Sequence, residues 1–253
     1  MSQPISENEL AAWKLETFRI TFFPAPEATL DGRKWWQESI GTIADLVEEK
    51  RDQLSILGEF RNGLLSQKSN TERTDWHYNK AISESATFED DVAFVAAIEP
   101  LIRGTMEAIA EKSPPVLRIA FGAVLIRHTD NIEESYKILS KFTGLNLEAS
   151  QCSEFVCRLN RWKSSDLIPE LRVNQLRDIS AFIRQQVQFR AGTGSTGSRV
   201  ILDPKNLSTG CRLLLDINTD AERSEPLPTS QIPELFRELI ELAVQISEQE
   251  RLP

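Results

Sequence analysis

The chain has 253 residues, of which 40% are hydrophobic and 26% are charged, and its formal net charge at pH 7 is −9. This composition is typical of a globular protein with a real core, and the length allows one large domain or two small ones. The negative charge argues against indiscriminate nucleic-acid binding, and no apolar stretch approaches the ~18 residues of a membrane span.

The N-terminal residues and the cysteines indicate the cellular compartment of the protein. Residues 1–11 are polar and acidic, without a basic start followed by an apolar run, so we expect a flexible tail and no signal peptide. The three cysteines, Cys152, Cys157 and Cys211, are an odd number and argue against a disulfide framework. We therefore expect a cytoplasmic protein without a membrane partner.

The charge is unevenly distributed along the chain. Residues 116–215 hold 14 Lys and Arg against 9 Asp and Glu, a net charge of +5, whereas the remaining residues hold 15 against 29, a net charge of −14. A basic middle in an acidic protein favours an acidic partner for that region, or an acidic surface on another copy of the chain.

Residues 12–113 are predicted to form an N-terminal α+β half, because strand-like alternation and helical spacing follow one another along them. Pro24 ends the first strand, and Pro100 is expected to kink the last helix or divide it in two, since proline removes a backbone donor. The predicted elements are a strand at 13–23, a helix at 35–51, a hairpin of strands at 54–67 and 73–82, and a helix at 88–112.

Residues 114–253 are predicted to form a C-terminal half with a similar order. Asp130 or Asn131 is placed to cap a helix that Gly144 ends, and Pro233 is tolerated in the first turn of the last helix. The predicted elements are a strand at 116–126, a helix at 131–143, strands at 155–162, 171–176, 182–190 and 213–217, and a helix at 232–248.

The order of these elements predicts an α+β fold. The first half reads β-α-β-β-α and the second β-α-β-β-(β)-α, which is close to the ferredoxin-like split β-α-β unit used twice. We therefore predict two tandem ferredoxin-like halves, in two antiparallel sheets or one continuous sheet, with helices packed on one face.

The segment from residue 155 to residue 190 carries the main functional signal. Apolar and polar side chains alternate along its predicted strands, with Gln185 as the exception, so one side should be buried and the other wet. The wet side, together with the later predicted strand, supplies the candidate binding residues Arg158, Asn160, Trp162, Arg184, Gln186, Gln188, Arg190 and Arg212.

Two binding functions and one simpler explanation fit this predicted face. Arg and Trp are favoured at protein interfaces, whereas an RNA-binding sheet usually exposes two or three aromatic side chains and this face offers one. We expect a non-catalytic subunit that docks onto a protein partner or onto another copy, with nucleic-acid binding as the alternative. The simpler explanation is that long polar side chains merely cover an exposed sheet.

Motifs for cofactors and metals are weak. The run Gly192–Gly197 matches the dinucleotide fingerprint, but a strand-like segment follows it where the phosphate site needs a helix. We therefore interpret it as a hairpin loop and predict no cofactor. His77 and His128 lie in different halves and the cysteines form no paired motif, so no metal site is predicted.

Catalytic chemistry ranks lowest. His128 precedes Thr129 and Asp130 at a predicted strand end, where it could act as the base of a small nuclease-type enzyme. Helix capping by Asp130 or Asn131 explains the same residues. The acids of Glu89–Asp91 suit the start of a helix as well as they suit a cation, so no catalytic residue is assigned.

Several segments in the C-terminal part of the chain carry a resemblance: Leu159–Arg161, Asn174–Leu176, Leu213–Asn218, Pro226–Pro228 and the predicted helix at 232–248. Together they resemble the end of a sporadically distributed bacterial family of unknown function. Asn218 stands where that family has Asp. The resemblance covers roughly the last hundred residues and implies a bacterial accessory protein in a mobile or defence-type gene neighbourhood, with no catalytic residues to carry over.

Overall fold

The structure, a computed structural model, describes residues 13–26, 28, 31–80, 92–152, 154–190 and 199–249, and it describes only the backbone of 185–190 and 199–206. The described strands form one nine-stranded antiparallel sheet in the order β2-β3-β4-β5-β1-β6-β9-β8-β7. They are β1 (Lys14–Pro24), β2 (Leu46–Lys50), β3 (Gln53–Phe60), β4 (Gly63–Ser69), β5 (Thr74–Lys80), β6 (Val116–Thr129), β7 (Val156–Ser164), β8 (Arg172–Arg190) and β9 (Arg199–Thr219).

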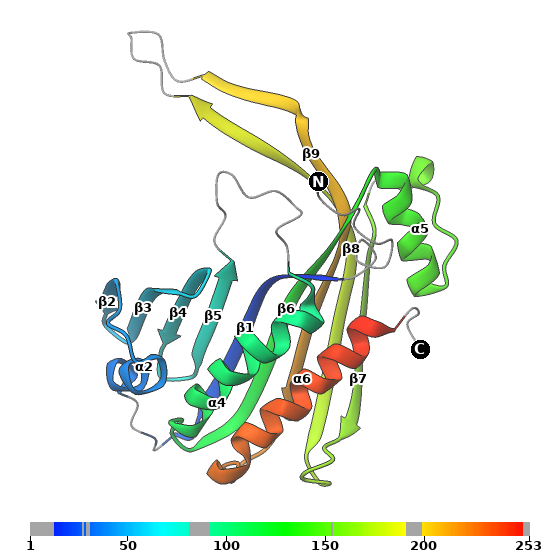
Figure 1. Ribbon diagram of the computed structural model, residues 1–253. Helices are drawn as coiled ribbons and strands as arrows, with labels where there is room; N and C mark the ends of the chain where they lie inside the picture. Colours follow the sequence, from blue (N-terminus) through cyan, green and yellow to red (C-terminus); the bar gives the residue numbers. More distant parts are fainter. Residues whose placement is uncertain are drawn as a thin grey trace.

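The helices of the described chain lie together on one face of this sheet (Figure 1), which confirms the predicted α+β class. None of them combines the length and the apolar character that crossing a bilayer requires. They are α2 (Gly32–Ile40), the continuous run of α3 (Phe94–Ala97), η2 (Ile98–Arg103) and α4 (Gly104–Glu111), then α5 (Ile132–Thr143) and α6 (Ile232–Glu248), with single turns at η3 (Ala149–Gln151) and η4 (Thr229–Gln231).

Strands β1 and β6 pair along the middle of the sheet and join its two halves. Their antiparallel register places Phe18 opposite Ala123 and Phe22 opposite Ile119. Alternate side chains of β1, from Phe18 through Ile20 to Phe22, point toward the helices and are at most 1% exposed. The core of the protein therefore lies between this pair of strands and the helix layer.

Buried aromatic side chains tie the helices to the sheet and to one another. The Phe22 ring packs edge-on against Trp35 of α2, at 5.0 Å between centroids, and against Phe236 of α6, at 5.1 Å. The indole Nε1 of Trp35 also donates a hydrogen bond to the backbone oxygen of Ile109 in α4, at 2.9 Å. Phe22 of β1 thus contacts α2 and α6, and Trp35 links α2 to α4.

The two halves of the chain repeat an order of elements, but it is not the ferredoxin-like one. Strand β1 is followed by α2, by the meander β2–β5 and by the run α3–α4, and strand β6 is followed by α5, by the meander β7–β9 and by α6. In each half the last strand of the meander returns beside the first strand. This order does not show two ferredoxin-like halves, whereas all the described strands join one open sheet, which is one of the two predicted arrangements.

The predicted helix at 35–51 is wrong in its second half. Helix α2 ends at Ile40, where Gly41 takes a left-handed φ of 73° and its N–H bonds back to the oxygen of Gln37. The following residues turn and form the edge strand β2, paired with β3. Ile43, which continued the apolar spacing, is 93% exposed. Glycine capping therefore overrode a spacing that fitted a helix.

The predicted strand at 54–67 is two strands, β3 and β4, joined by a tight turn. Arg61 begins the turn with a positive φ of 53°. Gly63 is needed after it, because a Cβ there would lie 2.6 Å from the Tyr78 ring. The pair Asn62-Gly63 is a common turn signal, and sequence patterning missed it because the apolar run was followed across it as one strand.

The interruption predicted at Pro100 takes the form of a π-helical turn. Residues of η2 run continuously from α3 into α4, so the helix changes its winding there. Proline has no N–H to donate to the preceding turn, and a wider turn accommodates that loss. The first residues of the predicted helix at 88–112 lie outside the described part of the chain.

Most predictions for the C-terminal half are confirmed. Strand β6 and helices α5 and α6 form where expected, with Asn131 Oδ1 accepting a hydrogen bond from the Glu134 N–H and Gly144 at a φ of 72°. The strands predicted at 171–176 and 182–190 are one strand, β8. Beyond Ser180 in β8, and before Thr209 in β9, these two strands pair only with each other, and they project from the sheet as a ribbon (Figure 1).

Replacing Phe22 by Ala should lower the free energy of unfolding by about 3–5 kcal/mol, because the lost ring fills the core between two helices. Replacing its neighbour Phe23 by Ala should cost about 1 kcal/mol, because that ring is half-buried on the other face and mainly stacks under Arg118. Urea unfolding followed by circular dichroism measures both losses. Equal losses would contradict the placement of the core on the helix side.

Candidate functional site

One face of the sheet carries no described helix, and we call it the uncovered face. Ile179 and Leu213 stand opposite each other beneath the helices and are at most 1% exposed, so Asp178, next to Ile179, points to the other side. The same alternation places these polar residues and one tryptophan on the uncovered face: Arg19, Asp75, His77, Arg118, Arg158, Asn160, Trp162, Arg172, Asn174, Asp178, Arg184, Arg212, Asp216 and Asn218.

The predicted site residues with described side chains share this face, but they are spread across it. The β7 residues lie at the edge of the sheet, Arg212 lies two strands inward, and Arg184 lies near the ribbon, about 20 Å along β8 from Asp178. Gln186, Gln188 and Arg190 belong to β8, but their side chains lie outside the described part of the chain. The residues that share the face are Arg158, Asn160, Trp162, Arg184 and Arg212.

Two of the predicted arginines are already paired with carboxylates. Arg158 donates through Nε and Nη2 to Oδ2 of Asp178 on the neighbouring strand, at 3.1 and 2.7 Å. Arg184 forms an ion pair with Glu16 and lies 4.7 Å from the centre of the Phe182 ring. Such exposed pairs add little stability, but they compensate the positive charge that the sequence suggested for this face.

Trp162 is the most exposed aromatic residue among the described side chains of the uncovered face. It is 63% exposed, and no other aromatic side chain that the structure describes is exposed to this degree. The guanidinium of Arg172 lies 4.7 Å from the centre of its ring and supports one side of it. Val156, on the same strand and face, is also 63% exposed. Strand β7 thus presents apolar and polar groups side by side.

The centre of the uncovered face holds a polar network that sequence reasoning missed. Arg118 Nη2 donates to Asn218 Oδ1 at 2.8 Å, and Asn218 Nδ2 donates to Asp216 Oδ1 at 3.1 Å. Arg19 reaches Asp216 from β1 at 3.7 Å. Burial lowers the pKa of Arg118 below its ordinary value, although Asp216 and Asp220 act in the opposite direction. The alternation of Asp216 and Asn218 with Leu215 and Ile217 was the signal that could have revealed them.

His77 lies on the same face and resists protonation. Burial lowers its pKa below the ordinary value of 6.5, and the charges of Arg19 and Lys68 lower it further, while Asp75 raises it. Asp75 itself accepts a hydrogen bond from the Thr21 hydroxyl at 2.7 Å. His77 is therefore a neutral member of the face at pH 7.

The residues considered for catalysis or metal binding do not form a reactive cluster. His128 packs against the Phe182 ring, with 6.0 Å between ring centres. Burial raises the pKa of Cys211 to about 12, so this thiol is inert at neutral pH. Within the described residues no three His, Cys, Asp or Glu side chains converge as metal ligands would. Glu89–Asp91 and Gly192–Gly197 lie outside the described residues.

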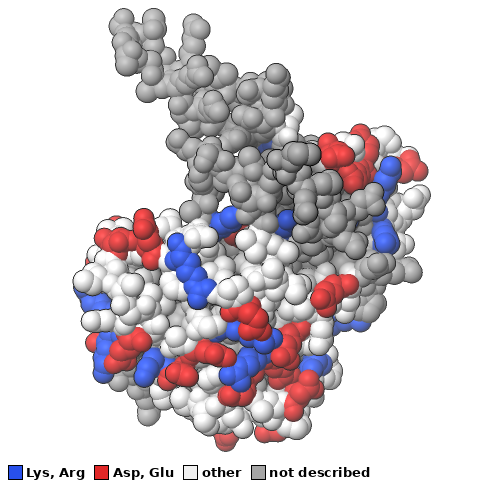
Figure 2. Space-filling model, viewed as in Figure 1, with Lys and Arg blue, Asp and Glu red and all other residues white. Residues whose placement is uncertain are grey.

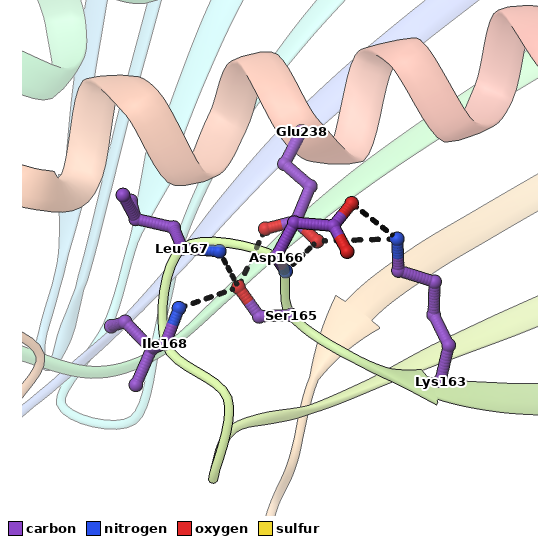
Figure 3. Close-up of polar contacts among 6 residues, drawn as sticks. All are labelled: Lys163, Ser165, Asp166, Leu167, Ile168 and Glu238. Atoms are coloured by element: carbon purple, nitrogen blue, oxygen red, sulfur yellow. Dashed lines mark hydrogen bonds and ion pairs between the residues drawn. The ribbon is translucent and has the colours of Figure 1, made fainter.

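A serine and a glutamate meet on the helix side, but their contacts are structural (Figure 3). The Ser165 hydroxyl donates to Glu238 Oε2 at 2.6 Å and accepts hydrogen bonds from the N–H groups of Leu167 and Ile168. Glu238 Oε1 accepts the N–H of Asp166 at 2.9 Å. These contacts hold the β7–β8 turn against α6, and so they fix the edge strand that carries Trp162.

Charge on the helix side is mixed. Figure 2 shows acidic and basic side chains interspersed over the helices, without a broad area of one sign. Several are paired, as in Arg237 of α6 with Glu107 of α4 at 2.8 Å. Among the described residues that this view shows, the helix side therefore offers no charged patch that would compete with the uncovered face as a docking surface.

Neither a comparison with protein-family models nor one with curated protein sequences finds a match for this chain.

The pH dependence of stability should include a contribution from His77. Because folding lowers its pKa, the unfolded chain binds its proton more readily, so stability should fall as the pH drops through 6.5 and should stop responding to this group only well above that value. His77→Gln should reduce the loss between roughly pH 7 and pH 5. Urea unfolding at both pH values measures this, and an NMR titration of the imidazole in the wild type checks it directly. Identical losses in both proteins would contradict the assignment.

Proposed function

We propose that this protein is a non-catalytic, macromolecule-binding subunit of a larger cytoplasmic assembly, and that the uncovered face docks its partner. The observation that carries the proposal is the outer strand β7, where exposed Trp162 and Val156 share one face with Arg158 and Asn160. A large accessible ring flanked by arginines is the composition that protein interfaces favour at their energetic centres.

The free edge of β7 supports the same proposal. This strand ends the sheet, so among the described strands its outer N–H and C=O groups have no neighbour. It has nine residues, of which Arg158, Arg161 and Lys163 are basic, whereas the opposite edge strand β2 has five. A short edge resists pairing, while a long edge can accept an added strand. A partner could therefore use the edge and the uncovered face together.

The arrangement of charge favours a protein over a nucleic acid. Arg158 and Arg184 each have a carboxylate partner, and Arg19 lies near Asp216. Nucleic-acid affinity depends on positive charges that replace counterions along the phosphates, and internal ion pairs reduce that capacity. Nucleic-acid binding through the same face remains our alternative. The bacterial origin and the defence-type setting implied by the resemblance belong to this proposal as well.

Exchanging Trp162 for Ala and Arg172 for Glu together should weaken partner binding about tenfold or more, because the variant loses the exposed ring and reverses the charge beside it. The partner is first identified by affinity purification of the tagged wild type from its host. Its affinity for the purified wild type and variant is then measured by calorimetry at equal ionic strength.

The matched control is Lys137→Glu combined with Leu145→Ala, which changes one exposed base and one exposed apolar residue at α5 and the loop that follows it. It should bind as the wild type does. Equal affinity of all three proteins would refute docking through the uncovered face. Affinity that falls steeply with salt and disappears after nuclease treatment would support the nucleic-acid alternative.

A further inference from the structure

We propose that a cavity on the helix side binds a small amphipathic carboxylate, independently of the docking face. The cavity has a volume of about 230 Å³ and lies between the sheet and the π-helical turn η2. Its lining residues come from β1, from the β3–β4 turn, from β5 and from the helical run: Leu15, Arg61, Asn62, Tyr78, Lys80, Val92, Ala97, Pro100 and Leu101.

Most of the wall of this cavity is apolar. Leu15, Tyr78 and Ala97 are each at most 5% exposed, and they belong to the main core. Val92, which is 48% exposed, lies where the cavity meets solvent. A hydrocarbon chain that entered would leave water and contact apolar surface on several sides, which is favourable.

The charged side chains in the described lining of the cavity are positive. Arg61 and Lys80 are basic, Asn62 and Tyr78 are neutral, and none of the described residues that line the cavity is acidic. The pKa of Tyr78 is raised by burial and lowered by the charge of Arg61, so this arginine acts electrostatically on the phenol, which stays a neutral hydrogen-bond donor at pH 7. A carboxylate would meet both a cation and a donor here.

Backbone geometry holds the cavity open. The left-handed residue Arg61 turns the chain at its rim, and the Tyr78 ring lies over Gly63, where a side chain would displace it. On the opposite wall Pro100 and Leu101 belong to the π-helical turn, which is wider than an α-helical one and is a feature often found at functional sites. Strands, a tight hairpin turn and a continuous helical run form these walls, so the cavity exists before a ligand arrives.

The volume sets the size of the ligand. A space of about 230 Å³ corresponds to about eight groups of the size of a water molecule, each taking ~30 Å³. This is below the range of pockets for drug-sized ligands. An unbranched carboxylate of about eight carbons therefore matches the space, and octanoate is the probe.

Titration calorimetry with octanoate should give saturable binding to the full chain. Octan-1-ol should bind about tenfold more weakly, since it lacks the charge that Arg61 and Tyr78 recognise, and octylamine more weakly still. Each methylene removed from the acid should weaken binding about fourfold. Methyl resonances of Leu15, Ala97 and Leu101 should shift on binding, which locates the ligand.

Arg61→Gln should weaken octanoate binding about tenfold and leave octan-1-ol unchanged. The control is Arg51→Gln, because Arg51 has a similar positive φ of 47° in another hairpin turn and does not line the cavity. Absence of saturable octanoate binding, equal effects of the two substitutions, or shifts confined to methyl groups outside the cavity would each overturn the proposal.

Discussion

The antiparallel pairing of β1 with β6 is the constraint on which the rest of the structure depends. These strands begin the two halves of the chain, and each also pairs with the last strand of its own meander. Their pairing turns two sets of strands into one sheet and aligns Phe18, Ile20 and Phe22 with the buried residues of β6. Helices from both halves then meet over this seam, where Phe22 contacts α2 and α6.

Because every described helix lies on one side of the sheet, the other side is stabilised by polar contacts between its strands rather than by helix packing. The other side exposes strands, and it is covered by ion pairs and amide hydrogen bonds that run across neighbouring strands, such as Arg158 with Asp178 and Arg118 with Asn218. These contacts keep the uncovered face soluble in water without a second helix layer. They also leave strand β7, with Trp162 at its surface, as the region best suited to contact another molecule.

The cavity beside η2 also follows from the way the helices pack on the sheet. The helical run must pass over the end of β5 and the β3–β4 turn, and Pro100 prevents a regular α-helix there. The wider turn and the glycine beneath Tyr78 leave a space that side chains do not fill. A local break in regular helical structure thus accompanies the cavity.

Local patterns in the sequence determined the α+β class, the strands that alternate apolar and polar residues, the capped helix α5 and the amphipathic helix α6, because these depend on neighbours along the chain. They also determined that Arg158, Asn160 and Trp162 share a face, since side chains alternate along any strand. The apolar spacing alone failed at Gly41 and Arg61, where one left-handed residue ends an element although the spacing continues. Only the tertiary structure decided that the nine described strands form one sheet, that Arg184 pairs with Glu16, and that Arg61 and Pro100 line one cavity. Each of these depends on contacts between residues far apart in the sequence, which no local pattern contains.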